Sequence, residues 1–196
     1  MNCLITGGAG FIGSNLADQL VKLNHKVIVL DNLSTGRVSN LKKIKEKIEF
    51  VNVDISDKKN SLQKYFNDID WVFHLAGKAD LLPSIANPSQ YFYTNVEGTL
   101  NVLEVSRKAN IKKFIYAASA SCYGIPTKFP TKENALLDPK NPYALTKLLG
   151  EQLTLHWSNL YGMPNLSLRF FNVYGPRSTK TGAYGSVFNI FLAQKL

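Results

Sequence analysis

The sequence predicts an α/β fold in which helices cover both faces of a doubly wound parallel sheet. Three observations support this class. Short apolar runs alternate with segments of helical periodicity along most of the chain. The run 71–75 is almost entirely apolar, as expected for a strand that is covered on both faces. A glycine-rich turn at 7–13 joins the first apolar run to the first helical pattern.

Each element follows from the spacing of its apolar residues and from the helix breakers between them. The predicted strands are residues 2–6, 26–30, 48–53, 70–74, 112–117 and 165–169. The predicted helices are residues 11–24, 57–67, 84–109 and 141–161, and Pro88 can break the third of these. Four prolines make the segment 124–142 a loop.

The turn at 7–13 has the glycine spacing that binds the pyrophosphate of a dinucleotide. Gly7, Gly10 and Gly13 form a GxxGxxG pattern behind a strand and in front of a helix. Glycine permits the tight turn, the approach of the backbone to the phosphates and the close packing of helix on strand. The free N–H groups at the helix N-terminus then face the anion. The pattern therefore predicts a Rossmann-type unit, against the alternative of a purely structural turn.

An acidic residue ends the second predicted strand. Asp31 can accept hydrogen bonds from both ribose hydroxyls of the adenosine, and it would repel a 2′-phosphate. The expected cofactor is therefore NAD rather than NADP. Two alternatives remain open: Asp31 serves only to cap the turn after the strand, or the nearby Arg37 receives a phosphate.

Length and composition suit a single globular domain. The chain has 196 residues, of which 45% are hydrophobic. It contains no apolar run of about 18 residues, and its N-terminus shows no signal region. Cys3, which we expect to be buried, and Cys122 form no disulfide framework, and the sequence shows no metal-ligand pattern. We therefore expect a cytoplasmic enzyme with no membrane contact and no metal.

The net charge of +9 raises the alternative of a nucleic-acid partner. The basic residues are scattered along the chain and are not interleaved with aromatic residues as in a stacking platform. We therefore expect no nucleic acid and a general attraction for anionic ligands.

A Tyr–Lys pair opens the last predicted helix. Tyr143 and Lys147 are four residues apart and share one helix face. A tyrosine hydroxyl titrates at about 10, and an ammonium beside a positive nicotinamide would lower that pKa, so that Tyr143 can act as a base. Lys147 can also hold the nicotinamide ribose. Ser119 follows the fifth strand, at the sheet edge where sites of this architecture form, and can hydrogen-bond the reacting oxygen.

With these residues, a set of motifs resembles the extended short-chain dehydrogenase/reductases, in the branch of NAD-dependent nucleotide-sugar epimerases and dehydratases. The motifs are GGAGFIG at 7–13, DNLSTG at 31–36, DI at 54–55, HLAG at 74–77, TNVEGT at 94–99, SASCYG at 119–124, YALTK at 143–147 and RFFNVYGPR at 169–177. They cover nearly the whole chain in the family's order.

The resemblance implies the roles of individual residues. Those implied to bind the cofactor are Gly7, Gly10, Phe11, Ile12, Gly13, Asp31, Asn32, Ser34, Thr35, Gly36, Asp54, Ile55, Leu75, Ala76, Gly77, Asn95, Tyr143 and Lys147. Asp54 and Ile55 are expected at the adenine, and Asn95 is expected to brace the active site. The implied catalytic triad is Ser119, Tyr143 and Lys147, and the implied substrate contacts are Ser119, Ser121, Asn172 and Arg177. Lys78 stands where the family often has alanine or a small polar residue.

The resemblance also narrows the reaction. Dehydratases of this branch carry an acidic pair after the triad serine or threonine, and the related decarboxylases usually carry a glutamate at the second position. Ala120 and Ser121 cannot act as acid or base at neutral pH, which leaves 4-epimerisation of a UDP-hexose through a transient 4-keto sugar. The alternatives are a non-catalytic NAD-binding sensor or scaffold, and an NAD-linked nucleotide-sugar dehydratase or 4-ketoreductase of the same fold.

Members of the family are longer than this chain. The resemblance implies an NAD-binding domain with the triad over residues 1–171, and the start of a truncated substrate-binding region over 172–196, with most of the C-terminal substrate lobe missing. The apolar pattern over 187–192, with no cap or turn after it, agrees with a fragment. Because family members pair through equivalent helices, we expect a homodimer that uses Leu100, Leu103, Leu148, Leu149, Leu153 and Leu155.

Overall fold

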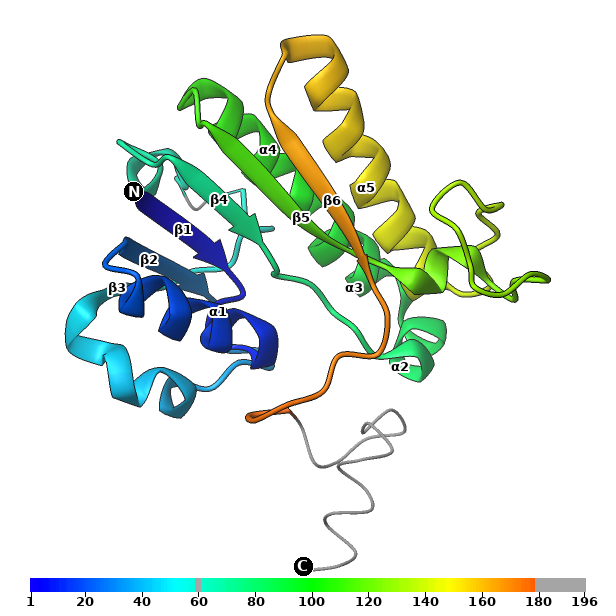
Figure 1. Cartoon of the computed structure of the whole chain (residues 1–196), viewed down its shortest axis with the longest axis horizontal. Helices are drawn as coiled ribbons and strands as arrows, with labels where there is room; N and C mark the ends of the chain where they lie inside the picture. The colour runs from blue at the N-terminus through cyan, green and yellow to red at the C-terminus, as the bar shows by residue number, and fades with distance from the viewer. Residues whose placement is uncertain (59–60, 179–196) are drawn as a thin grey trace, which may run out of the picture.

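A computed structural model describes residues 1–58 and 61–178. Its centre is a parallel sheet of six strands in the order β3-β2-β1-β4-β5-β6 (Figure 1). The strands are β1 Asn2–Thr6, β2 Lys26–Asp31, β3 Ile48–Asn52, β4 Trp71–His74, β5 Lys113–Ser119 and β6 Asn165–Phe170. All six predicted strands are present, and their order is that of a Rossmann fold.

Two hydrophobic cores lie on opposite faces of the sheet, because successive strand residues point to opposite sides. On one face, Ile5 and Val29 pack with the helix α1 (Phe11–Lys22) and the 3₁₀ helix η1 (Val38–Lys47). On the other face, Leu4 and Leu30 belong to a cluster with residues of α4 (Gly98–Lys108). The helix α5 (Pro142–Tyr161) runs beside β5 and β6 (Figure 1). The doubly wound arrangement predicted from the sequence is confirmed.

The third predicted helix is divided into four parts. They are α2 Leu81–Ala86, α3 Pro88–Tyr91, the π-helical segment η3 Phe92–Glu97 and α4. The break falls at Pro88, as predicted, and the side chain of Asn87 caps the new start by accepting a hydrogen bond from Gln90 N at 3.4 Å. The π-helical segment then turns Asn95 into the protein, where only 1% of its surface is exposed.

The predicted helix over 57–67 is wrong. The described residues of this segment contain only the short 3₁₀ helix η2 (Gln63–Tyr65), with Leu62 and Phe66 buried beside it. Two anchors one turn apart fix a single turn in the core, but they supply too short an apolar stripe for a longer helix. Asp68, in the left-handed region with φ of 59°, ends the segment.

The helix α5 carries clear start and stop signals. Asn141 accepts a hydrogen bond from Ala144 N at 2.9 Å, Pro142 occupies the first helical position, and Gly162 ends the helix in the left-handed conformation. Cys3 is fully buried, as predicted. Of the helices in the described part of the chain, none is both long and apolar enough to cross a membrane. The apolar pattern at 187–192 lies outside the described residues.

Candidate active site

A cavity of about 630 Å³ lies at the carboxyl ends of the strands, where the chain order reverses between β1 and β4. Open sheets of this kind bind ligands at this point, and the volume is in the range of small-molecule sites. The predicted cofactor residues on its wall are Gly7, Gly10, Phe11, Ile12, Gly13, Asp31, Asn32, Ser34, Thr35, Asp54, Ile55, Leu75, Ala76 and Gly77. The structure therefore brings together residues that the sequence separates by up to 70 positions.

The glycine turn is too tight for side chains at two of its positions. Gly7 has φ of 69°, and a Cβ there would lie 2.7 Å from Ala76 N. A Cβ at Gly13 would lie 2.4 Å from Gly7 O. At Gly10, by contrast, the only neighbour is Gly7 O at 3.2 Å, and the residue faces the cavity. Gly7 and Gly13 thus allow the turn to form, whereas Gly10 leaves open backbone for a ligand.

Asp31 both caps the local turn and lines the cavity. Its Oδ2 accepts a hydrogen bond from Ala9 N at 2.9 Å, and its Oδ1 accepts one from Leu33 N at 2.8 Å. Asp31 therefore caps the turn after the strand, which was the structural role considered from the sequence. Each carboxylate oxygen can accept two hydrogen bonds, so capacity remains for two ribose hydroxyls. Gly36 does not line the cavity, but a Cβ there would lie 2.8 Å from Asp31 Oδ1.

Asp54 presents a second carboxylate on the cavity wall. Burial acts to raise its pKa, but hydrogen bonds from Ser56 and Asn32 outweigh burial, and the charge of Lys78 adds to their effect. The pKa of Asp54 is therefore lowered, and its side chain is an ionised acceptor at neutral pH. Lys78, whose role was open from the sequence, lies on the same wall.

The predicted base Tyr143 lies in the first turn of α5. Burial raises the pKa of its hydroxyl, a hydrogen bond with Ser119 opposes that rise, and Asp80 and Cys122 add to it. In the protein alone, burial outweighs the hydrogen bond with Ser119, and the pKa is raised. The lowered pKa expected from the sequence concerns Tyr143 beside a bound nicotinamide and stays a prediction. A lowered value depends on the positive charge that a bound nicotinamide would bring.

Lys147 occupies a buried position beside the cavity. Burial lowers the pKa of its ammonium to about 8, so the group is mostly charged at neutral pH. Its Nζ lies 4.6 Å from the centroid of the Tyr116 ring. A Cβ added at Gly77 would lie 3.9 Å from the same nitrogen, which places the charge behind the cavity wall at this glycine.

Ser119 is arranged as a hydrogen-bond donor. Its Oγ accepts hydrogen bonds from Ser121 N at 3.2 Å and from Ser121 Oγ at 2.8 Å. Both lone pairs are then used, so the proton of Ser119 is available for the hydroxyl of Tyr143. In this structure, Ser121 therefore donates hydrogen bonds to Ser119.

A buried chain of hydrogen bonds fixes the tautomer of His74. Thr99 Oγ1 donates to Asn95 O at 2.6 Å, so it must accept from His74 Nε2–H at 2.9 Å. His74 Nδ1 then accepts from Thr6 Oγ1 at 2.7 Å. Burial lowers the pKa of His74 to about 3, so the ring is neutral. Both ring nitrogens of this strand-end histidine therefore have hydrogen-bond partners.

The chain continues through Asn95 to the helix of the predicted base. Asn95 Oδ1 accepts from Lys78 N at 2.8 Å, and its Nδ2 donates to Lys78 O at 3.1 Å and to Thr146 Oγ1 at 3.0 Å. Thr146 Oγ1 in turn donates to Tyr143 O at 2.9 Å. Asn95 thus links the cavity wall to the first turn of α5, in agreement with the expected bracing role.

Two predicted substrate residues lie apart from these groups. Asn172 is exposed in the segment after β6. Arg177 forms an ion pair with Asp18 of α1 through Nη2, while its buried Nη1 has no hydrogen-bond partner among the described residues. The contacts of both residues with a substrate stay predictions.

Sequence reasoning missed several residues on the wall: Leu30, Val53, Lys78, Ala79, Asp80, Leu82, Pro83, Thr94 and Ala117. Leu30, Val53 and Ala117 end predicted strands, which was the available signal, because sites form at that edge. Thr94 lies in η3 and opens the motif TNVEGT, which was the signal there, whereas the others come from the loop after β4 and from α2, where the sequence carries no strand-end signal. Within residues 1–58 and 61–178, no three His, Cys, Asp or Glu side chains gather as a metal-ligand set.

Comparison with known proteins agrees with this geometry. A family model described as "NAD dependent epimerase/dehydratase family" matches residues 3–195. A putative UDP-glucose 4-epimerase from Methanocaldococcus jannaschii is 42% identical over 194 residues, which are 98% of this chain and 62% of that protein.

Solved structures give the same result. The chain matches a crystal structure of UDP-glucose 4-epimerase with UDP-glucose from Thermotoga maritima with a TM-score of 0.90 and 39% identity, over 97% of this chain and 62% of that one. For the Thermus thermophilus UDP-glucose 4-epimerase in complex with NAD, the TM-score is 0.86 and the identity 36%, over 93% and 59% of the two chains. The present chain spans less than two thirds of the length of these relatives. It belongs to the NAD-dependent epimerase/dehydratase family.

Proposed function

We propose that the chain binds NAD in the cavity at the switch point and carries the catalytic groups of a UDP-hexose 4-epimerase. One observation carries this proposal most directly. The glycine turn, Asp31 and Asp54 line one cavity, and the wall of that cavity at Gly77 adjoins the ammonium of Lys147. The arrangement offers an anion site, ribose acceptors and a cation at the other end of one ligand-sized space.

The residues present fit NAD. The open backbone at Gly10 and the start of α1 would hold the pyrophosphate. Asp31 retains the lone pairs for the adenosine ribose, and its charge would repel a 2′-phosphate. Lys147 would hold the nicotinamide ribose. Bound NAD supplies a reversible hydride acceptor, and it is regenerated in each cycle.

The proton chemistry falls to the side chains. Tyr143 would take the proton of the sugar 4-hydroxyl as the C4–H bond breaks, which leaves a 4-keto sugar. Ser119 would donate a hydrogen bond to the reacting oxygen, and Lys147 would stabilise the phenolate form of Tyr143. After the 4-keto sugar has rotated, the same proton would return to the oxygen and the hydride to the opposite face of C4, so the products balance the reactants.

The positions after Ser119 favour epimerisation over loss of water or carbon dioxide. Ala120 carries no ionisable group, and the hydroxyl of Ser121 donates to Ser119 Oγ. Neither residue supplies the acid–base pair that a dehydratase of this family uses. The alternatives are a non-catalytic NAD-binding protein and an NAD-linked dehydratase or 4-ketoreductase.

We further propose the division into an NAD-binding domain over residues 1–171 and the start of a substrate-binding region over 172–196.

We also propose a homodimer through η3, α4 and α5. Leu103 and Leu148 are buried in the subunit and cannot serve this contact, whereas Leu155 is 44% exposed. Phe92 and Tyr93 add exposed apolar surface on η3. Light scattering that shows only monomer would contradict the dimer.

The test of the function has two stages. Calorimetry first measures binding of NAD to the 196-residue chain, and we expect binding with preference over NADP. The chain, and a longer form that continues past Leu196, are then incubated with UDP-glucose and NAD, and the sugar is followed by NMR. For the longer form we expect an equilibrium mixture of 4-epimers without net NADH, and for the chain itself little or no turnover.

Other outcomes separate the alternatives. Tight NAD binding without conversion by the longer form would favour a sensor or scaffold. Net NADH formation would identify a dehydrogenase or ketoreductase, and a 4-keto-6-deoxy sugar would identify a dehydratase. A chain that does not bind NAD would contradict the proposal as a whole.

A further inference from the structure

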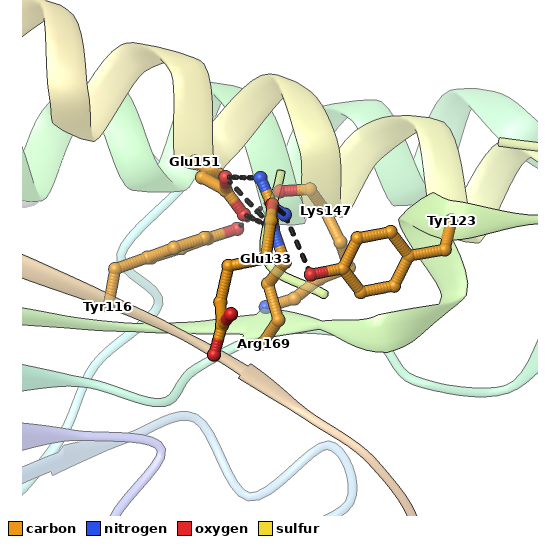
Figure 2. A network of polar contacts seen from close by, with 6 residues as sticks. All are labelled: Tyr116, Tyr123, Glu133, Lys147, Glu151 and Arg169. Atoms are coloured by element: carbon orange, nitrogen blue, oxygen red, sulfur yellow. Dashed lines mark hydrogen bonds and ion pairs between the residues drawn. The ribbon is translucent and has the colours of Figure 1, made fainter. Parts of the chain in front are cut away.

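One guanidinium group joins four segments of the chain beside the predicted catalytic groups (Figure 2). Arg169 of β6 donates from Nε to both oxygens of Glu151, at 3.1 and 3.0 Å, and from Nη2 to Oε1 at 2.6 Å. Its Nη1 donates to Tyr123 Oη at 2.8 Å and to Glu133 O at 2.7 Å. In Figure 2, the carboxylate of Glu133 points away from the group, so only its backbone takes part.

The central ion pair is withdrawn from water. The side chain of Glu151 is 5% exposed, and that of Arg169 is 18% exposed. The hydrogen bonds to Glu151 raise the pKa of Arg169, so its charge is permanent. A buried ion pair adds little net stability, because desolvation offsets the attraction. The directional fork of arginine is better suited to fixing the relative positions of its partners.

The residues that Arg169 contacts lie on the elements that carry the predicted catalytic groups. Tyr123 is the last residue of the 3₁₀ helix η4 (Ala120–Tyr123), whose N-cap is Ser119. Glu151 lies one helical turn after Lys147 on α5, the helix that begins with Tyr143 in its first turn. In the sheet, Arg169 pairs with Ala118, the residue before Ser119. The guanidinium therefore bridges the turn that carries the serine and the helix that carries the tyrosine and lysine.

The turn packs on α5, because Cys122 and Tyr123 form a buried apolar cluster with Leu148 of that helix, but its other polar restraints are few. Within η4 and its ends, Ser121 N bonds Ser119 Oγ and Gly124 N bonds Ser121 O at 3.2 Å. One backbone hydrogen bond, from Asp138 N to Cys122 O at 2.8 Å, ties it to the following loop. These three hydrogen bonds hold the turn together without reaching α5, and the apolar packing on Leu148 is not directional. Arg169 adds a directional link, because it bonds both the hydroxyl of Tyr123 and Glu151 of α5.

We infer that Arg169 is a positioning residue that keeps the hydroxyl of Ser119 within hydrogen-bonding distance of Tyr143. It touches neither the cofactor cavity nor the reacting groups, and it acts through Tyr123 and Glu151. The inference gives the network a part in the reaction and to that extent rests on the proposed function. The hydrogen bond between Ser119 and Tyr143 is a property of the protein alone, and its loss can be followed without turnover.

The experiment uses the 196-residue chain with tyrosine labelled with ¹³C at Cζ. The signal of Tyr143 is assigned by its loss in Tyr143→Phe, and Ser119→Ala gives its position without the Ser119 hydrogen bond. Arg169→Lys keeps the charge opposite Glu151 but cannot form the fork. Tyr123→Phe removes one hydroxyl and leaves the ion pair intact. The matched control is Trp157→Phe, which also removes one side-chain hydrogen bond from α5, that between Trp157 Nε1 and Glu104 at 3.1 Å.

We expect Arg169→Lys and Tyr123→Phe to move the Tyr143 signal by at least half of the displacement seen in Ser119→Ala, while Trp157→Phe leaves it in place. An unchanged signal in both network variants would overturn the inference, as would an equal displacement in Trp157→Phe. If Arg169→Lys does not fold, Tyr123→Phe decides alone. NAD binding, measured in parallel, tests the proposed function separately, because its absence leaves the reading of the Tyr143 signal intact.

Discussion

On the side of β1 and β2 the candidate site is made of backbone, whereas on the side of β5 and α5 it is made of side chains held by other side chains. Around the glycine turn, the important property is missing volume: a Cβ at Gly13 would lie 2.4 Å from Gly7 O. Around Tyr143, position depends on partners from other elements, such as Ser119 on β5 and Asn95, which bonds Thr146. The first region needs only a short stretch of sequence, and the second needs the whole fold.

This difference determines what a substitution changes in each region. A change in the backbone region disturbs packing and ligand space together, because the same atoms serve both. A change in the side-chain region can remove one chemical group and leave the fold in place. The following predictions separate the two cases, from the largest expected effect to the smallest.

Tyr143→Phe should remove the chemistry and keep NAD bound, because it deletes only the proton-transferring hydroxyl. In a form of the protein that converts UDP-hexose, we expect kcat to fall by roughly 10²–10⁴-fold. NMR of the sugar measures conversion, and calorimetry measures NAD. The control is Tyr93→Phe at an exposed tyrosine, which should change neither. Retained turnover in Tyr143→Phe would remove Tyr143 from the mechanism.

Gly13→Ala should lower the free energy of unfolding by roughly 1–3 kcal/mol, the usual cost of overpacking a tight site. The new Cβ would collide with backbone that cannot move aside. Gly10→Ala should cost less stability than Gly13→Ala, because its Cβ would meet only Gly7 O at 3.2 Å, and it should weaken NAD binding, because the residue lines the cavity. Denaturant unfolding and calorimetry measure the two effects. Equal stability of both variants would contradict the assignment of separate roles.

Asp31→Ala should cost about 1–3 kcal/mol in NAD binding, through loss of charge-assisted hydrogen bonds to the ribose. The preference for NAD over NADP should shrink, because the repulsion of the 2′-phosphate is also lost. The variant also leaves the N–H groups of Ala9 and Leu33 without this acceptor, so stability should fall as well. Titrations with both dinucleotides test this, with the exposed Glu46→Ala as control. Equal affinity of the unmodified chain for both dinucleotides would be incompatible with the idea.

His74 should make the protein less stable in mild acid. Its pKa is about 3 in the folded protein and about 6.5 when unfolded, so the unfolded chain binds the extra proton between these values. The contribution of His74 is complete above pH 6.5 and is lost as the pH falls. We expect a loss of about 1.4 kcal/mol between pH 7.5 and pH 5.5.

Denaturant unfolding at the two pH values measures this loss. The matched variants are His74→Gln, which should lose this part of the pH dependence, and the exposed His156→Gln, which should keep it. An unchanged pH dependence in His74→Gln would show that another group is responsible.

The sequence predicted the backbone region best, because its signals are local. The three glycines and Asp31 lie within one strand–helix–strand unit, and the structure places all four on one cavity wall. It also predicted the six strands. The helix over 57–67 failed because two buried anchors, Leu62 and Phe66, suggested a longer apolar stripe than exists.

For the side-chain region the sequence named candidate residues, whose roles stay predictions, but it gave no information on their burial. Ser119, Tyr143 and Lys147 follow from spacing and order, but the raised pKa of Tyr143 results from burial, which spacing does not encode. The sequence pattern did not reveal the network of Arg169, because its partners come from three other segments that only the fold brings together. The sequence pattern thus did not predict which side chains are buried by distant elements or which distant side chains pair.

The π-helical segment η3 makes the site sensitive to the number of residues within the segment as well as to their identity. An α-helix rotates by about 100° for each residue, so one residue inserted or deleted between Tyr91 and Gly98 would rotate one flank against the other. Tyr91 Oη donates to Asp80 O at 2.6 Å on one side of the segment, and Thr99 Oγ1 bonds His74 on the other. Both contacts are kept only at the present length. Insertions or deletions of one residue should therefore be far less tolerated here than at residues 127–130, which are exposed and where a change of length can be absorbed at the surface.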